Sequence, residues 1–133
     1  MNYKFILILL FILFIIFYRL ETKEKMVIIK NFSTPEEIER GLMFIKKPLG
    51  KNRGALFKME NRVHSFWMRN TFIPLDIIFL NDKWEVVCLV KNAKPLDETN
   101  VGCNVISKYA IEVDSGYIEE NGVKIGDKLS LEF

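Results

Sequence analysis

The chain has 133 residues, which is enough for one domain with a single modest core and too few for two domains. Its formal net charge of +2 arises from Lys4 and Arg19, so residues 21–133 retain 17 basic and 17 acidic side chains. A neutral domain does not favour nucleic-acid binding by counterion release, and we therefore expect no nucleic-acid partner.

The chain begins with a run of fourteen apolar residues, 5–18, between Lys4 and Arg19. The aliphatic stems of these two side chains can extend towards a membrane surface, which lengthens the span to about twenty residues. We expect residues 1–20 to form a signal anchor, an N-terminal transmembrane helix, followed by a charged linker over 21–25. A buried core helix is the alternative, although a run that is apolar on all sides suits so small a domain poorly.

This anchor is expected to stay uncleaved. Residues 1–31 contain no Ala, Gly, Ser or Cys, so the sequence offers neither a signal-peptidase site nor a cysteine for lipid modification there. The positive charges on the two sides of the apolar run do not decide its orientation. We expect a single-pass membrane protein whose domain lies on the extracytoplasmic or lumenal side.

Residues 26–133 predict one β-rich domain. Short runs of β-branched and aromatic residues, separated by turn residues, indicate six or seven strands. The clearest runs cover residues 25–30, 55–59, 75–80, 84–91, 108–114 and 128–133, with a further apolar patch at 66–69. Because little helix separates them, we expect a compact, mainly antiparallel sandwich or partly closed barrel.

Two short helices complete the predicted domain. Thr34 can cap the first helix, Glu37 completes a capping box, and Gly41 weakens or ends the helix. The second covers residues 115–121. Alternation predicts the buried faces of two strands, with Trp84, Val86, Cys88 and Val90 on one and Leu129, Leu131 and Phe133 on the other.

Three segments together resemble a known family. They read RGLMF at 40–44, FWMRNTFIPLDIIFL at 66–80, and YAIEVDSG at 109–116 with Gly126-Asp127 further on. In these segments the chain is similar to the domain of unknown function 192 (DUF192), over about residues 26–131. The resemblance implies a compact, mainly β domain that is jelly-roll-like in places and often follows a signal or anchor segment. It implies no particular activity.

No motif predicts a cofactor or a metal site. His64 is the only histidine, and Cys88 and Cys103 lack the C-x-x-C spacing of metal and redox sites. Ser65 follows His64 directly, but adjacent residues of a strand point to opposite faces. The sequence also lacks G-x-S-x-G, P-loop and G-x-G-x-x-G motifs. An enzyme is therefore the less favoured class.

A group of polar and aromatic residues lies near the strand at 75–80. Asp76 opens this apolar strand, and a buried carboxylate needs hydrogen bonds or a cation to offset its loss of hydration. We favour a turn network that fixes the preceding loop, and the alternative is a small polar pocket for a peptide, sugar or small anion. The group consists of Arg40, Met43, Trp67, Met68, Arg69, Asn70, Thr71 and Asp76.

The two cysteines allow two interpretations. Fourteen residues separate Cys88 from Cys103, and in an oxidising compartment a disulfide between them would contribute about 3 kcal/mol. In a reducing compartment both are small apolar side chains.

These observations favour a non-enzymatic, membrane-tethered accessory domain. It would bind a peptide, a protein partner or a small ligand near residues 40–76, and the sequence does not indicate its oligomeric state. The alternative is a hydrolase that uses Asp76 as a base, with Arg40 or Arg69 to steady an anion.

Overall fold

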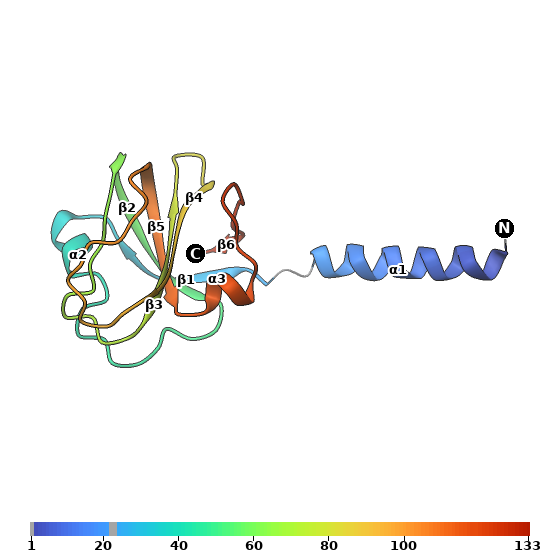
Figure 1. Ribbon diagram of the computed structural model, residues 1–133, viewed down its shortest axis with the longest axis horizontal. Helices are drawn as coiled ribbons and strands as arrows, with labels where there is room; N and C mark the ends of the chain where they lie inside the picture. Colours follow the sequence, from blue (N-terminus) through green and yellow to red (C-terminus); the bar gives the residue numbers. More distant parts are fainter. Residues whose placement is uncertain (1, 22–23) are drawn as a thin grey trace.

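The computed structural model describes residues 2–21 and 24–133, and these form three helices and six strands (Figure 1). Residue 1 of the predicted anchor and residues 22–23 of the predicted linker lie outside the described residues. The helices are α1 (Tyr3–Glu21), α2 (Pro35–Arg40) and α3 (Tyr117–Glu120). The strands are β1 (Met26–Phe32), β2 (Arg53–Val63), β3 (Leu75–Leu80), β4 (Val86–Ala93), β5 (Ile106–Asp114) and β6 (Leu131–Glu132).

The strands form one open sheet in the order β4-β3-β5-β2-β1-β6. Neighbours from β4 to β2 pair antiparallel, whereas β1 pairs parallel with both β2 and β6. The mainly β prediction is confirmed, but the structure differs from the predicted sandwich or partly closed barrel. One cause is the connection over residues 33–52, which carries α2 and returns the chain parallel to β1, as a crossover does.

Apolar side chains cover both faces of this sheet. We call the cluster that includes Phe57 the α2-side core, because Ile38 of α2 packs against it. The opposite cluster, the α3-side core, includes Ile111 of β5 and Ile118 of α3. β3 lies between β4 and β5 with both faces covered, so all six of its residues are buried.

Patterns of neighbouring residues in the sequence predict several elements correctly. β3 covers residues 75–80, as predicted. Thr34 Oγ1 accepts a hydrogen bond from the Glu37 backbone at 3.2 Å, and the Glu37 carboxylate accepts one from the Thr34 backbone at 3.0 Å. These two bonds confirm the predicted capping box of α2. The helix ends at Gly41, whose φ of 44° is free of steric penalty only for glycine.

A bulge in β4 makes one predicted alternation wrong. The register of β3 against β4 shifts by one residue at Val87, between the Phe79–Cys88 and Leu80–Val86 pairs. Cys88 therefore lies in the α2-side core and Val86 in the α3-side core. Side chains alternate between the two faces of a sheet only along a strand that contains no bulge residue.

Two further predicted strands are shorter in the structure. The patch at 66–69 forms only the isolated bridge between Phe66 and Val101. At the C terminus, Leu129 and Leu131 pack against the α3-side core as predicted, whereas Phe133 is 71% exposed. Only residues 131–132 pair with β1, so the edge strand ends before its side-chain alternation is complete.

The helix α1 extends away from the sheet in Figure 1. The side chains of its residues 3–18 are exposed, including large apolar ones such as Phe11 and Phe14. Within residues 2–21 and 24–133, no helix combines the length and apolarity that a membrane span requires.

Candidate functional site

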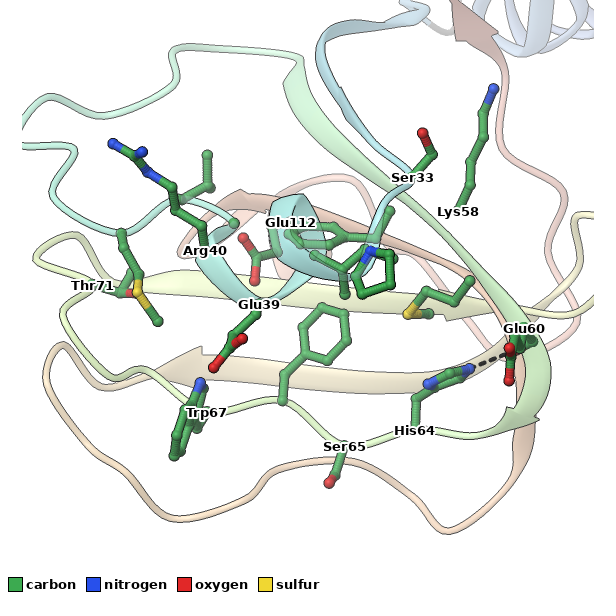
Figure 2. Close-up of a pocket in the computed structure, with 18 of the residues that line it drawn as sticks. Ser33, Glu39, Arg40, Lys58, Glu60, His64, Ser65, Trp67, Thr71 and Glu112 are labelled. Carbon is green, nitrogen blue, oxygen red and sulfur yellow. Dashed lines mark hydrogen bonds between the residues drawn. The ribbon is translucent and has the colours of Figure 1, made fainter.

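A pocket of about 690 Å³ opens on the face of the sheet that α2 covers (Figure 2). Its size lies in the range of small-molecule and peptide side-chain sites. Five parts of the chain build it: α2 with the residues just before and after it, the second half of β2, the segment 64–67, Thr71, and Glu112 of β5.

Glu112 is the buried carboxyl group of this pocket. It faces the α2-side core from β5, where its register partners are Ala55 of β2 and Ile77 of β3. Both partners are fully buried, and Glu112 itself is 6% exposed. A carboxyl group is therefore inserted in the middle of an apolar face.

The burial of the Glu112 Oε2 atom is not compensated by a hydrogen bond from any described residue. Burial raises the pKa of the Glu112 carboxyl to about 8, because loss of hydration disfavours the charged form. At pH 7 the group is thus mostly a neutral acid, which can donate one hydrogen bond and accept others.

Aromatic rings build the apolar wall of the pocket. The ring of Phe57 lies 4.9 Å from that of Phe32 and 5.0 Å from that of Phe66, between ring centroids. A Cβ atom on Gly41 would lie 3.1 Å from Cζ of Phe57, so the glycine lets the end of α2 approach this ring closely. At the rim, the Arg69 guanidinium lies 5.3 Å from the centre of the Trp67 ring, within cation–π range.

The segment that carries Phe66 and Trp67 is held by the loop at residues 94–105. Phe66 and Val101 exchange two backbone hydrogen bonds, at 2.9 and 2.8 Å. The Met68 backbone donates to the Asp97 carbonyl at 2.8 Å. A disulfide joins Cys103 in this loop to Cys88 of β4, with 5.7 Å between their Cα atoms. The wall of the pocket is thereby linked to the sheet.

The structure brings most of the predicted site residues together. Arg40, Met43, Trp67 and Thr71 line the main pocket. Arg69 and Asn70 line a smaller adjoining pocket of about 290 Å³, with Arg40, Met43 and Trp67 on the shared side. Met68 is 1% exposed and belongs to the α2-side core, so it packs in the interior and does not line either pocket.

Asp76 does not join this group. Its Oδ1 accepts a hydrogen bond from the backbone of Asn92 at 2.8 Å, and its Oδ2 accepts two from Gly116 and Ile118 at 3.1 and 2.9 Å. Asn70 and Thr71, the nearest donors in the sequence, do not supply these bonds. Asp76 is 1% exposed, and its bonds join β4 and the start of α3 to β3. Its role is therefore structural, but it does not fix the loop before β3 as predicted.

Glu112 is the site residue that the sequence reasoning missed. Its sequence signal is the same as that of Asp76, because each is an acidic residue within an apolar strand. His64 also lines the pocket, where its Nε2 donates to the Glu60 carbonyl at 2.6 Å. Figure 2 shows the His64 ring turned towards Glu60 and the Ser65 hydroxyl directed away from it. The two side chains therefore form no catalytic pair.

Comparisons with known proteins agree with this architecture. A family model, DUF192, described as "Uncharacterized ACR", matches residues 18–131. No curated protein matches the chain. A protein of unknown function from Novosphingobium aromaticivorans is 36% identical with a TM-score of 0.71, over 77% of this chain and 72% of that one.

A second solved structure is similar to a comparable degree. It is a protein from Sinorhizobium meliloti, provisionally described as a transcription regulator, which is 30% identical with a TM-score of 0.72. The match covers 74% of this chain and 77% of that one. Because the family model matches residues 18–131, which is most of this chain, the chain belongs to the DUF192 family.

Proposed function

We propose that this chain is a non-enzymatic accessory module, tethered to a membrane through α1, that binds a ligand in the pocket between α2 and the sheet. The observation that carries the proposal is the unpartnered Oε2 of Glu112 in that pocket. A buried polar atom without a partner costs free energy, on the order of 1–3 kcal/mol, and a ligand that supplies the missing hydrogen bond offsets this cost.

The surroundings of Glu112 suit a ligand with both apolar and polar parts. Phe57 and Phe66 offer an apolar wall, while Arg40 and Thr71 place polar groups at other points of the lining. Such a combination is typical of sites that bury a side chain or a small molecule and orient it by a few hydrogen bonds.

Binding is a better account of this geometry than hydrolysis. The proposed base of a hydrolase, Asp76, has both oxygens engaged by backbone N–H groups and does not line the pocket. Its two proposed helpers, Arg40 and Arg69, lie instead beside Trp67. Glu112, the buried carboxyl group among those that line the pocket, has an Oε2 atom with no hydrogen-bonded nucleophile among the described residues.

The description of the Sinorhizobium relative as a transcription regulator is not part of this proposal. Residues 21–133 carry equal numbers of basic and acidic side chains, and DNA-binding domains use a net positive surface to neutralise phosphates. The proposed ligand enters a pocket on one face of the sheet, and this proposal requires no nucleic acid.

The proposal is tested by mapping a fragment library onto the protein. The ¹⁵N-labelled full chain in detergent micelles is screened by NMR with amine, amide, alcohol and carboxylate fragments. We expect binders to shift the signals of residues 40–43, 57–60, 64–67 and Glu112. Binders that map elsewhere, or a library without a binder, would contradict a pocket function.

Two variants one residue apart provide a matched control. Met43 lines the pocket, so Met43→Trp should fill its mouth and abolish fragment binding. Phe44 is 54% exposed and is absent from the lining, so Phe44→Trp should leave fragment affinity unchanged.

A further inference from the structure

Resting on the proposed binding function, we propose that the pocket accepts a cationic nitrogen group on an apolar stem, as in the arginine or lysine side chain of a peptide, with Glu112 as its counter-ion. The chemical class follows from two features of the described residues: an unpaired buried carboxyl group and an apolar, aromatic wall beside it.

Within the described part of the chain, no cation pairs with the Glu112 carboxyl group. The ion pairs found among the described residues join Lys51 to Glu24, Arg62 to Glu60 and Arg69 to Glu98, and none includes Glu112. Figure 2 shows the Arg40 guanidinium directed away from Glu112. A guanidinium or ammonium group from a ligand would therefore meet a carboxyl group that is free to pair, and a guanidinium could pair with both of its oxygens.

The walls suit the stem and the charge of such a ligand. Met43 and Met59 line the pocket with flexible apolar side chains, which adapt to an alkyl stem. Phe57 and Phe66 present aromatic rings, whose faces attract cations most strongly where water is excluded. A neutral ligand can only share a hydrogen bond with this carboxyl group, whereas a cation also gains its full charge once the group ionises, and an anion would be repelled by that charge.

Ionisation of Glu112 makes the binding pH-dependent. The free pocket holds the proton on Glu112 because burial alone raises its pKa to about 8. A cation binds the ionised form, so each binding event below pH 8 releases one proton. The affinity should therefore rise about tenfold per pH unit between pH 6 and 8 and level off above that value.

Other charged side chains of the pocket lining must be separated from this effect. They are Glu39 and Arg40 of α2, Lys58, Glu60 and Arg62 of β2, and His64 of the following segment. None of them contributes to the raised pKa of Glu112, whose only cause is burial. Histidine as a residue type changes charge between pH 5 and 8, so His64 is the group that a control has to remove.

The test compares two probes of the same shape. N-acetyl-arginine amide and N-acetyl-citrulline amide are titrated calorimetrically into the full chain in detergent micelles at pH 6, 7, 8 and 9. At pH 8 we expect the arginine probe to bind at least tenfold more tightly. Its affinity should fall about tenfold per pH unit below pH 8, with release of about one proton, while the citrulline probe stays independent of pH.

Variants separate this inference from the proposed function. Glu112→Gln keeps the volume of a neutral acid, so it should remain folded, lose the preference for arginine and lose the pH dependence. His64→Gln should keep both. The inference of a cationic ligand would be overturned by equal affinity for the two probes, by binding of neither probe, or by an arginine preference that survives Glu112→Gln. In each of these cases, fragment binding that Met43→Trp blocks would still support the proposed pocket function. Failure of the fragment screen would overturn the pocket function itself.

Discussion

Two buried acidic residues of neighbouring strands have opposite surroundings. Asp76 of β3 accepts three backbone hydrogen bonds, whereas Glu112 of β5 leaves a buried oxygen without a partner. The first arrangement stabilises the fold, since hydrogen bonds to a charged group contribute about 1.5–3 kcal/mol each. The second opposes folding, and the proposed ligand would offset its cost. The two residues should therefore respond to substitution in opposite ways.

Glu112→Gln should change how stability depends on pH. The folded protein keeps the Glu112 proton up to a pKa of about 8, while the unfolded chain releases it near the ordinary value of 4.5. Between these values the unfolded state binds fewer protons, so this group makes the free energy of unfolding fall by about 1.4 kcal/mol per pH unit. Gln does not titrate, so the variant lacks this decline.

Urea denaturation of both proteins at pH 5, 6, 7 and 8 measures the effect. The advantage of the variant over the wild type should grow steadily with pH across this range. A difference in the free energy of unfolding that stays constant from pH 5 to 8 would mean that Glu112 is already ionised in the folded protein.

Asp76→Asn should destabilise the protein by roughly 1–3 kcal/mol, because an amide nitrogen would face the backbone N–H groups that the carboxylate accepts from. Denaturant midpoints at one pH measure the loss. Asp82 lies exposed in the turn before β4, so Asp82→Asn is the matched control and should stay within about 0.5 kcal/mol of wild type. An unchanged midpoint for Asp76→Asn would contradict a structural role.

At the scale of elements, the loop at residues 94–105 determines the position of the pocket wall. It reaches the segment 64–68 through the Phe66–Val101 bridge, and the Cys88–Cys103 disulfide fixes its far end to β4. A Cβ atom on Gly102 would lie 2.9 Å from the His64 carbonyl oxygen, which shows how closely the two segments pack. Loosening this loop should therefore affect both stability and the pocket.

Replacement of both Cys88 and Cys103 by Ser should cost about 3 kcal/mol, the value for a closed loop of about 15 residues. The amide of Phe66, which donates to the Val101 carbonyl, should also exchange its hydrogen faster. Urea midpoints and hydrogen exchange measure the two effects. The wild type treated with reductant should behave like the double variant, and an insensitive wild type would show that the bond is not formed in the isolated protein.

The sequence predicts elements better than it predicts their assembly. β3 and the capping box of α2 depend on neighbouring residues, and both are confirmed. The β4 bulge depends on its pairing with β3, and the open sheet depends on the crossover to β2, so neither is visible in local periodicity. The local sequence also does not show that Asp76 is hydrogen-bonded whereas Glu112 is not. The donors to Asp76 come from residues 92, 116 and 118, which are distant in the sequence.

At the scale of the whole molecule, the chain has two unlike parts. A body built on a six-stranded sheet carries the pocket, and α1 extends from it with exposed apolar side chains (Figure 1). Exposed apolar surface of this extent is unfavourable in water, and contact with lipid would remove that cost. The membrane tether and the extracytoplasmic or lumenal location of the body stay predictions.

The tether predicts the behaviour of the full chain in bacterial cells. Most of the protein should sediment with membranes, resist extraction with alkaline carbonate and keep its original N terminus by intact mass. Leu10→Lys combined with Leu13→Lys places two charges in α1 and should move the protein to the soluble fraction. A wild-type protein in the soluble fraction, or a mature chain that begins between residues 22 and 33, would exclude the tether.

The most direct test of the account is a titration of the Glu112 carboxyl group itself. In the ¹³C-labelled full chain, the carboxyl signal assigned through Glu112→Gln is followed by NMR from pH 4 to 10. We expect a midpoint near pH 8 in the free protein, since burial raises the pKa of this group to about 8, and a lower midpoint with N-acetyl-arginine amide present. A midpoint between about 4 and 5 in the free protein, as for an exposed glutamate, would show a carboxyl that is already hydrated or paired and would contradict the account.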